Sequence, residues 1–225
     1  MRLDGKEMAA ALEVAYNGVG RIVEGLAEGD YMRPTRCAGW VVSDLLYHML
    51  LDAQRALVAF ASPASGAPDV DFATYWRPFS ATDESSVSAA RFVRIAASAY
   101  ASPASLVRRW NETAAAAARA AHSATYSGPI TTQGHVLEVP DFIATLVVEA
   151  TIHHLDLIWE LPTAPPPDSE PMQVVRLTLD DLMSGEAPAT WDDTTYALKA
   201  TGRLPLDQND RAALGNLART LPLFS

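Results

Sequence analysis

Apolar residues recur at steps of three and four over several long stretches of the chain, which is the pattern of helices that bury one face. Glycine or proline interrupts the pattern between these stretches. At Ser102-Pro103 a serine N-cap and a proline at the first helical position favour the restart of a helix. The predicted long helices cover residues 4–25, 41–60, 83–123 with the restart at Ser102-Pro103, and 140–162.

The segments between and after these helices have other patterns. Residues 61–80 hold several prolines and are predicted to form a long loop. Polar and apolar residues alternate over residues 126–139 around Gln133-Gly134, which indicates a short β-hairpin. Residues 162–171 hold five of the fifteen prolines and are a linker by composition.

Beyond that linker the helical pattern returns in three short stretches, at about residues 172–183, 193–200 and 207–220. The sequence therefore predicts an all-α protein built on an antiparallel four-helix bundle with a short hairpin. The expected division is a bundle over residues 1–162, a proline-rich linker over 163–171 and a small helical C-terminal extension over 172–225.

The composition is that of a folded globular protein, and it narrows the classes of partner. Of the 225 residues 49% are hydrophobic and 20% are charged, and no apolar run reaches the ~18 residues that a membrane span requires. A net charge of −10 argues against the basic surface that nucleic acid or an anionic membrane would need. The N-terminus predicts no signal peptide, and the single Cys37 fits a reducing compartment, so we expect a cytoplasmic protein.

Glu149 and His153 are four residues apart in the most apolar helical stretch, residues 142–159. That spacing is little more than one turn, so both side chains leave the same face of the helix. A carboxylate and an imidazole that point together into an apolar environment need a partner, and a metal ion satisfies both. A Glu and a His at this spacing are also common as a solvated pair on a helix surface, and spacing alone leaves that alternative open.

Two ligands do not hold a metal tightly, and His48 is the candidate for the third. It lies in the other strongly amphipathic stretch, residues 43–57, although a lone histidine beside Met and Leu is often a hydrogen-bonded core residue. The second and fourth helices of a bundle can face each other across the core, which would bring His48 to the face of Glu149 and His153. Three protein ligands and an open position are the arrangement of a catalytic zinc site rather than a structural one.

Two motifs resemble those of a known family. The stretch Thr35-Arg-Cys-Ala-Gly-Trp-Val-Val-Ser-Asp-Leu-Leu-Tyr-His48 is similar to the T-x-C-x-G-W-x-V-x-D-L-x-x-H motif of the mycothiol-dependent maleylpyruvate isomerase-like proteins, a branch of the DinB superfamily. The stretch Glu149-Ala-Thr-Ile-His153-His154-Leu-Asp156-Leu is similar to the E-x-x-x-H-x-x-D-L segment on the fourth helix of that family. The order and separation of the two motifs also match.

The resemblance implies a DinB-like bundle with a divalent metal, usually zinc, held by His48, Glu149 and His153. It also implies mycothiol, a low-molecular-weight thiol that replaces glutathione in some bacteria, as co-substrate, and an electrophilic small molecule as the second substrate. Zinc lowers the pKa of a bound thiol well below the ~8.5 of a free one, so the thiolate nucleophile exists at neutral pH. The isomerase of the family has a larger second domain, so substrate identity does not carry over.

The tail of the chain carries a third resemblance. Residues 191–206 are similar to a segment of the same family, W-x-x-x-x-F-x-L-x-x-T-G-R-x-P-L. This resemblance implies that Arg203 approaches the bundle and receives an anionic substrate, because arginine forks onto carboxylates. The simpler interpretation is that Thr201-Gly202-Arg203 ends a helix and places a basic residue near its dipole.

Several neighbours of the motifs have weaker interpretations. Asp156, three residues after His153, can orient a metal-bound histidine, although an ordinary surface carboxylate fits the sequence equally well. His154 points about 100° away from His153 and is expected to lie behind the metal or on the surface. Cys37 could approach the metal, but we interpret it as a small buried residue. Val41 stands where the family commonly has a threonine N-cap, so the second helix needs a cap from elsewhere.

Two functions fit these features. The first is a divalent-metal-dependent transferase or isomerase that uses mycothiol, with the metal activating the thiolate. The second is a non-catalytic helical bundle that binds a metal and a small molecule or partner, because the fold alone does not choose between them. The complete ligand set with an open position favours the enzyme.

Overall fold

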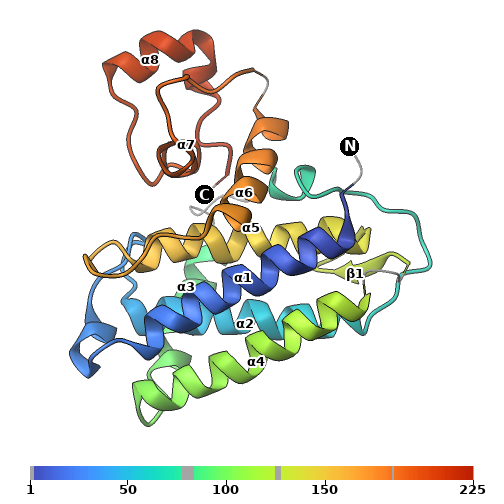
Figure 1. Ribbon diagram of the computed structural model, residues 1–225, viewed down its shortest axis with the longest axis vertical. Helices are drawn as coiled ribbons and strands as arrows, with labels where there is room; N and C mark the ends of the chain where they lie inside the picture. Colours follow the sequence, from blue (N-terminus) through green and yellow to red (C-terminus); the bar gives the residue numbers. More distant parts are fainter. Residues whose placement is uncertain (1–2, 78–83, 125–127, 184, 225) are drawn as a thin grey trace.

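The four long helices of the computed structural model form a bundle (Figure 1). The structure describes residues 3–77, 84–124, 128–183 and 185–224. The four helices are α1 (Gly5–Glu24), α2 (Val42–Phe60), α4 (Pro103–Ala124) and α5 (Val139–Leu157). Helix α1 packs against α4 and α5, and α2 packs against the same two helices, so the four enclose one core. The predicted all-α bundle is therefore confirmed.

The bundle has four pairs of neighbouring helices. Two of these pairs are antiparallel and two are parallel. Asn111 in the first half of α4 donates to Glu24 at the end of α1, as expected for an antiparallel pair. Phe60 at the end of α2 packs against Phe142 near the start of α5, so these two helices are antiparallel as well. Helices α1 and α5 run in the same direction, as do α2 and α4 (Figure 1).

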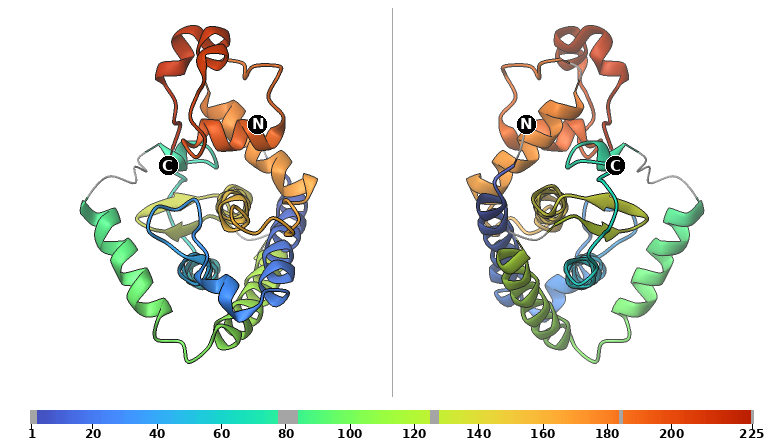
Figure 2. Two further views of the ribbon diagram at one scale, coloured as in Figure 1. Left: turned by 90° about the vertical axis from the view of Figure 1, so that its left-hand side faces the viewer. Right: turned by 90° about the vertical axis from the view of Figure 1, so that its right-hand side faces the viewer.

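The connection between α2 and α4 returns along the bundle, which lets these two helices run in the same direction. It contains the short 3-10 helix η2 (Thr74–Trp76) and helix α3 (Glu84–Ala97), which packs beside α2 at the edge of the bundle (Figure 2). The predicted restart at Pro103 is confirmed, since α4 begins there. Residues 78–83 and 125–127, which belong to the predicted loop, third helical region and hairpin, lie outside the described residues.

The predicted hairpin is confirmed. Strands β1 (Ile130–Thr132) and β2 (His135–Leu137) pair antiparallel, with Ile130 opposite Leu137. The turn residues Gln133 and Gly134 have φ angles of 50° and 83°, as a two-residue turn between antiparallel strands requires. Strand β1 packs against α2 and places the turn at one end of the bundle.

The cap of α2 comes from inside the helix. Val41 is the N-cap residue, and its side chain accepts no hydrogen bond. Its backbone N–H donates instead to Asp44 Oδ2 at 3.1 Å, in the first turn. The carboxylate satisfies one of the free donors at the helix start and also complements the helix dipole, which replaces the missing threonine.

The C-terminal part is helical, as predicted, and packs on the bundle. Helix α6 (Ser169–Leu182) contacts α5 and α1, and α7 (Asp193–Ala200) contacts α6. Helix α6 begins inside the segment predicted to be a linker, because Pro171 falls in its first turn, where proline is tolerated. The division into domains remains a prediction. The remaining short helices are α8 (Gln208–Leu214) and the 3-10 helices η1 (Glu28–Met32) and η3 (Gly215–Arg219).

None of the helices in the described part of the chain is long and apolar enough to cross a membrane. The apolar core continues from the bundle into the C-terminal part, where Val175, Leu179 and Tyr196 are fully buried. The extension is thus fixed against α5 by packing, and it can place side chains beside the residues of that helix.

Candidate metal centre

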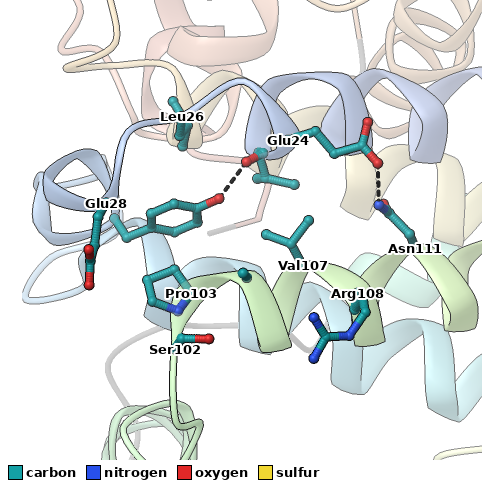
Figure 3. A pocket seen from close by; sticks show the side chains of 11 residues that line it. Glu24, Leu26, Glu28, Ser102, Pro103, Val107, Arg108 and Asn111 are labelled. Carbon is teal, nitrogen blue, oxygen red and sulfur yellow. Dashed lines mark hydrogen bonds between the residues drawn. The ribbon is translucent and has the colours of Figure 1, made fainter.

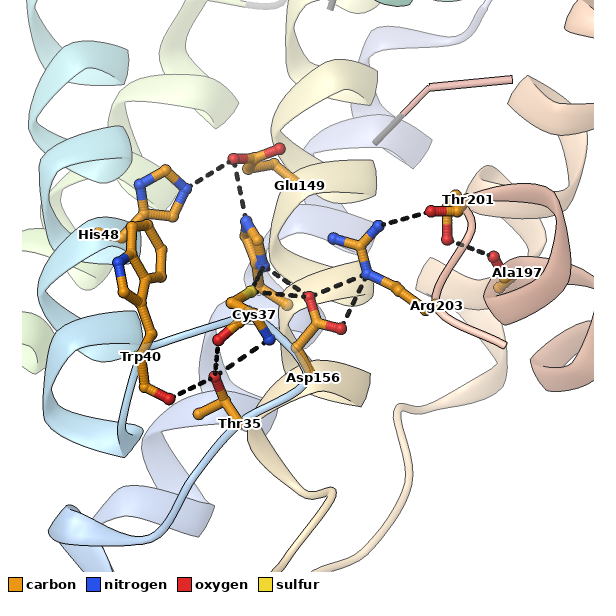
Figure 4. Close-up of polar contacts among 10 residues, drawn as sticks. Thr35, Cys37, Trp40, His48, Glu149, Asp156, Ala197, Thr201 and Arg203 are labelled. Atoms are coloured by element: carbon orange, nitrogen blue, oxygen red, sulfur yellow. Dashed lines mark hydrogen bonds and ion pairs between the residues drawn. The ribbon is translucent and has the colours of Figure 1, made fainter. Parts of the chain in front are cut away.

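Helices α2 and α5 bring the three predicted ligands together (Figure 4). His48 lies in the second turn of α2, and Glu149 and His153 lie on the face of α5 turned toward it. His48 Nε2 is 3.0 Å from Glu149 Oε1, and His153 Nε2 is 3.3 Å from the same oxygen. Because the two helices are antiparallel, the start of α2 meets the end of α5 and joins residues 101 positions apart.

The distances between these atoms suit one metal ion. A tetrahedral ion with bonds of about 2.0–2.1 Å keeps its donors roughly 3.3 Å apart. The three donor atoms all lie within 4.8 Å of one another, and the two imidazole rings meet edge to face with their centroids 4.8 Å apart. His48, Glu149 and His153 also line one cleft, so an ion among them keeps a position open to small molecules.

Asp156 lies behind His153, on the side of the ring away from Glu149. Its Oδ2 is 2.9 Å from His153 Nδ1, which leaves Nε2 of that ring directed at Glu149. Arg203 Nε donates to both Asp156 oxygens at 2.8 and 3.0 Å (Figure 4). Asp156 is fully buried, so its interpretation as a surface carboxylate is wrong. A carboxylate in this place fixes the tautomer and the orientation of a metal-binding histidine.

The charges in this group stabilise one another. Burial raises the pKa of Glu149, but the charge of His153 and hydrogen bonds from both histidines outweigh it and hold the pKa well below its usual value. Burial lowers the pKa of His153, but the nearby Glu149, Cys37 and Asp156 hold it well above its usual value. A proton and an incoming metal ion compete for the lone pair of His153 Nε2. Metal affinity is therefore expected to fall as the pH is lowered.

The loop before α2 explains the first motif in physical terms. The Thr35 hydroxyl accepts the backbone N–H of Cys37 at 3.2 Å and donates to the carbonyl of Trp40 at 3.1 Å. Gly39 has a φ angle of 78°, which favours glycine. The Trp40 ring then lies 5.1 Å from the His48 ring, measured between centroids. The threonine, the glycine and the tryptophan therefore shape the loop that packs beside His48.

Cys37 is half-buried and lies beside His153, so its interpretation as a simple buried residue is wrong. Its Sγ is 3.4 Å from Asp156 Oδ2 and 3.7 Å from His153 Nδ1. Cys37, His153 and Asp156 form a second group of atoms with suitable spacing for a metal. Arg203 already donates to both oxygens of Asp156, and a cation there would face its guanidinium. The group with His48 is therefore the better metal site.

His154 points away from the centre, as predicted, but it does not lie on the surface. It is 3% exposed, and its Nε2 is 3.0 Å from the carbonyl oxygen of Pro165. Burial lowers the pKa of His154, which favours the neutral ring as the donor to that carbonyl. A Cβ on Gly18 of α1 would come within 3.3 Å of this ring. His154 therefore anchors the segment after α5 to the bundle.

The chain from residue 12 to residue 158 matches the family model of the mycothiol maleylpyruvate isomerase N-terminal domain. The chain belongs to this family. The matched segment contains both motifs and all three convergent ligand candidates, whereas Arg203 and the rest of the C-terminal extension lie beyond it. The chain matches no curated protein and no solved structure. Membership connects it to mycothiol-related, metal-binding DinB-like bundles.

The three ligand candidates of this family member open onto a cleft of about 640 Å³, a size typical of small-molecule sites. The sequence did not single out most of its other wall residues. The position of Asp52 could have been predicted from the sequence, because it follows His48 by four residues and therefore lies on the same face of the helix. The wall residues contributed by loops had no periodic pattern to mark them. They include Tyr75, Trp76, Gln133 and Phe224.

The carboxylate of Asp52 lines this cleft, and its burial in the charged form destabilises the folded protein. Burial and the charge of Glu149 raise the pKa of Asp52 to about 6, although Arg55 lies 3.0 Å away and opposes the shift. In the unfolded chain the group ionises near its ordinary value of 3.8. Ionised Asp52 thus destabilises the folded protein above pH 6, and the penalty disappears as the pH falls toward 4.

We expect Asp52→Asn to stabilise the metal-free protein at pH 7.5 by roughly 1–3 kcal/mol, because the amide removes the buried charge. At pH 4 the two proteins should unfold at nearly the same urea concentration. Urea denaturation at the two pH values measures the difference. The control is Asp181→Asn, which changes an exposed carboxylate of α6 and should be neutral at both pH values. A destabilised Asp52→Asn protein at pH 7.5 would contradict the expectation.

A second hollow of about 500 Å³ lies between the end of α1 and the start of α4 (Figure 3). Tyr31 donates to the carbonyl of Val23 there, and Asn111 donates to Glu24. The residues that line it include no histidine and no cysteine. This hollow therefore offers no donor set comparable to that of the first cleft.

Proposed function

We propose that the protein is a divalent-metal-dependent enzyme that uses a low-molecular-weight thiol, mycothiol, in a transferase or isomerase reaction. The observation that carries the proposal is the convergence of His48, Glu149 and His153 on one point at the wall of a cleft. When bound, a divalent metal supplies the Lewis acidity that keeps a thiol as thiolate at neutral pH. Zinc is the proposed metal, because two imidazoles, one carboxylate and an open position form a common catalytic zinc set.

The residues around the donors set the charge and the orientation of the site. Glu149 brings a single negative charge, so the site with a divalent ion has a net charge of plus one, which a thiolate neutralises. Asp156 holds the ring of His153 through Nδ1, and Arg203 in turn holds Asp156. We propose Asp156 as the residue that orients His153. The thiol must stay reduced, as in the cytoplasm.

Binding of a thiol at the metal tests the proposal directly. We expect that millimolar thiol added to the cobalt-loaded protein produces a sulfur-to-metal charge-transfer band and releases a proton, because a metal binds the deprotonated form. The control is His154→Ala, which leaves the three donors in place and should give the same band. An unchanged spectrum with cobalt demonstrably bound would favour the other function, a non-catalytic bundle with a closed metal site.

A further inference from the structure

The lining of the cleft has two chemically different parts. One part is the three donor residues with their ring nitrogens and carboxylate. In the other, the indole of Trp76 in η2 stacks on the ring of Phe224 near the C-terminus, with centroids 4.6 Å apart and planes 24° apart. Both rings are buried and line the cleft together with Phe142 of α5 and Val93 of α3. This part of the lining is therefore apolar and largely aromatic.

The place of Phe224 is fixed by the last residues of the described chain. The backbone N–H of Leu223 donates to the carbonyl of Ala200 at the end of α7, at 2.8 Å. Gly202 adopts a φ angle of 73°, and a Cβ there would come within 3.3 Å of Pro222. The tail therefore lies tightly against the end of α7, and it supplies one face of the cleft.

Two of the three arginines that line the cleft are paired with carboxylates of the protein. Arg203 donates to both oxygens of Asp156, and Arg55 pairs with Asp52 at 3.0 Å. The guanidinium of Arg36 lies over the ring of Trp159, 5.7 Å from its centroid, at the end of α5. No lysine is among the residues that line the cleft. The contact with Trp159 leaves the N–H groups of Arg36 able to donate, and its Nε has no hydrogen-bond partner in the described part of the chain. An uncharged ring needs none of the three arginines and would leave the two ion pairs intact.

We propose that the stacked pair of Trp76 and Phe224 binds a flat, uncharged aromatic or conjugated ring of the electrophilic substrate. This inference rests on the proposed function, because it assigns the second substrate of that reaction. With an activated aryl chloride, the thiolate sulfur attacks the ring carbon that bears chlorine. A sulfur–carbon bond forms, the carbon–chlorine bond breaks, and chloride leaves with the bonding electrons. The proton of the thiol is released when its sulfur binds the metal.

The test uses 1,3-dinitrobenzene, which has such a ring and no leaving group. Its dissociation constant is measured by isothermal titration calorimetry on the full-length protein. Phe224→Ala should weaken binding roughly three- to tenfold, because it removes one side of an aromatic stack. Phe224→Trp should restore it. The matched control is Phe92→Ala, which removes an exposed aromatic ring from α3 away from the stacked pair. Circular dichroism verifies that each variant is folded.

The result does not depend on the metal. His153→Ala should bind dinitrobenzene as tightly as the unchanged protein, so a failure of the metal site and a failure of this inference are distinguishable. Maleate, a small dicarboxylate of similar flatness, should bind more weakly than dinitrobenzene. Unchanged affinity of folded Phe224→Ala for dinitrobenzene, or tighter binding of maleate, would overturn the proposal.

Discussion

Replacing His153 by alanine is expected to remove the bound metal. The variant keeps His48 and Glu149, but two donors do not sustain an affinity that three provide, and the loss should exceed the ~100-fold that removal of an outer hydrogen-bond partner can cause. Elemental analysis of the purified proteins measures the effect. We expect close to one divalent ion per chain in the unchanged protein and close to none in His153→Ala.

His154→Ala is the matched control, because it removes an equally buried imidazole of the same helix that faces Pro165 instead of Glu149. Its metal content should equal that of the unchanged protein. The metal affinity of Asp156→Asn should lie between those of His154→Ala and His153→Ala. It should be about 10- to 100-fold lower than that of the unchanged protein, since the substitution weakens the hydrogen bond that orients His153. Equal metal content in the unchanged protein and in His153→Ala would end the metal-site proposal.

Arg203→Ala is expected to destabilise the protein by ~3–5 kcal/mol, since it removes one partner of a buried ion pair and leaves Asp156 in the interior with His153 alone. Asp156 has no exposed surface, and burial alone would raise its pKa; the His153 hydrogen bond and the Arg203 charge keep it below its usual value. Guanidinium denaturation of the metal-free proteins measures the difference in the free energy of unfolding.

The double variant Asp156→Asn/Arg203→Met separates a structural role of Arg203 from a role in binding substrate. It removes both charges together, so most of the lost stability should return. If Arg203 serves only to receive an anionic substrate, Arg203→Ala will unfold like the unchanged protein and will change KM alone. That outcome would restore the role implied by the family resemblance.

The bundle could be predicted from sequence because its signals are local. Helix periodicity, Pro103 at a helix start and Gln133-Gly134 at a turn each act over a few residues. The spacing of Glu149 and His153 placed both on one face, and the motif containing His48 named their partner. The direction of α4 was not predictable in this way, because helix periodicity shows which residues form a helix but not which way that helix runs beside its neighbours.

The surroundings of the site depend on contacts between distant segments, which no local pattern encodes. Arg203 meets Asp156 across 47 positions, and Phe224 meets Trp76 although neither belongs to a periodic stretch. The surroundings of His154 and Cys37 were not predicted correctly for the same reason. Their surroundings come from the carbonyl of Pro165 and from the loop of residues 35–40, which are fixed only when the extension and the loop pack on α5.

The parallel neighbours α1 and α5 have a consequence for the order in which the chain folds during synthesis. Helix α1 is synthesised before α5, yet α5 covers one side of its apolar face, and α5 is completed only at Leu157. Until then the ribosome holds a chain whose first helix exposes an apolar face to chaperones or to other nascent chains. Contacts so distant in sequence also slow closure of the bundle. The three donors come from both α2 and α5, so the proposed metal site can form only after α5 has been made and has joined the bundle.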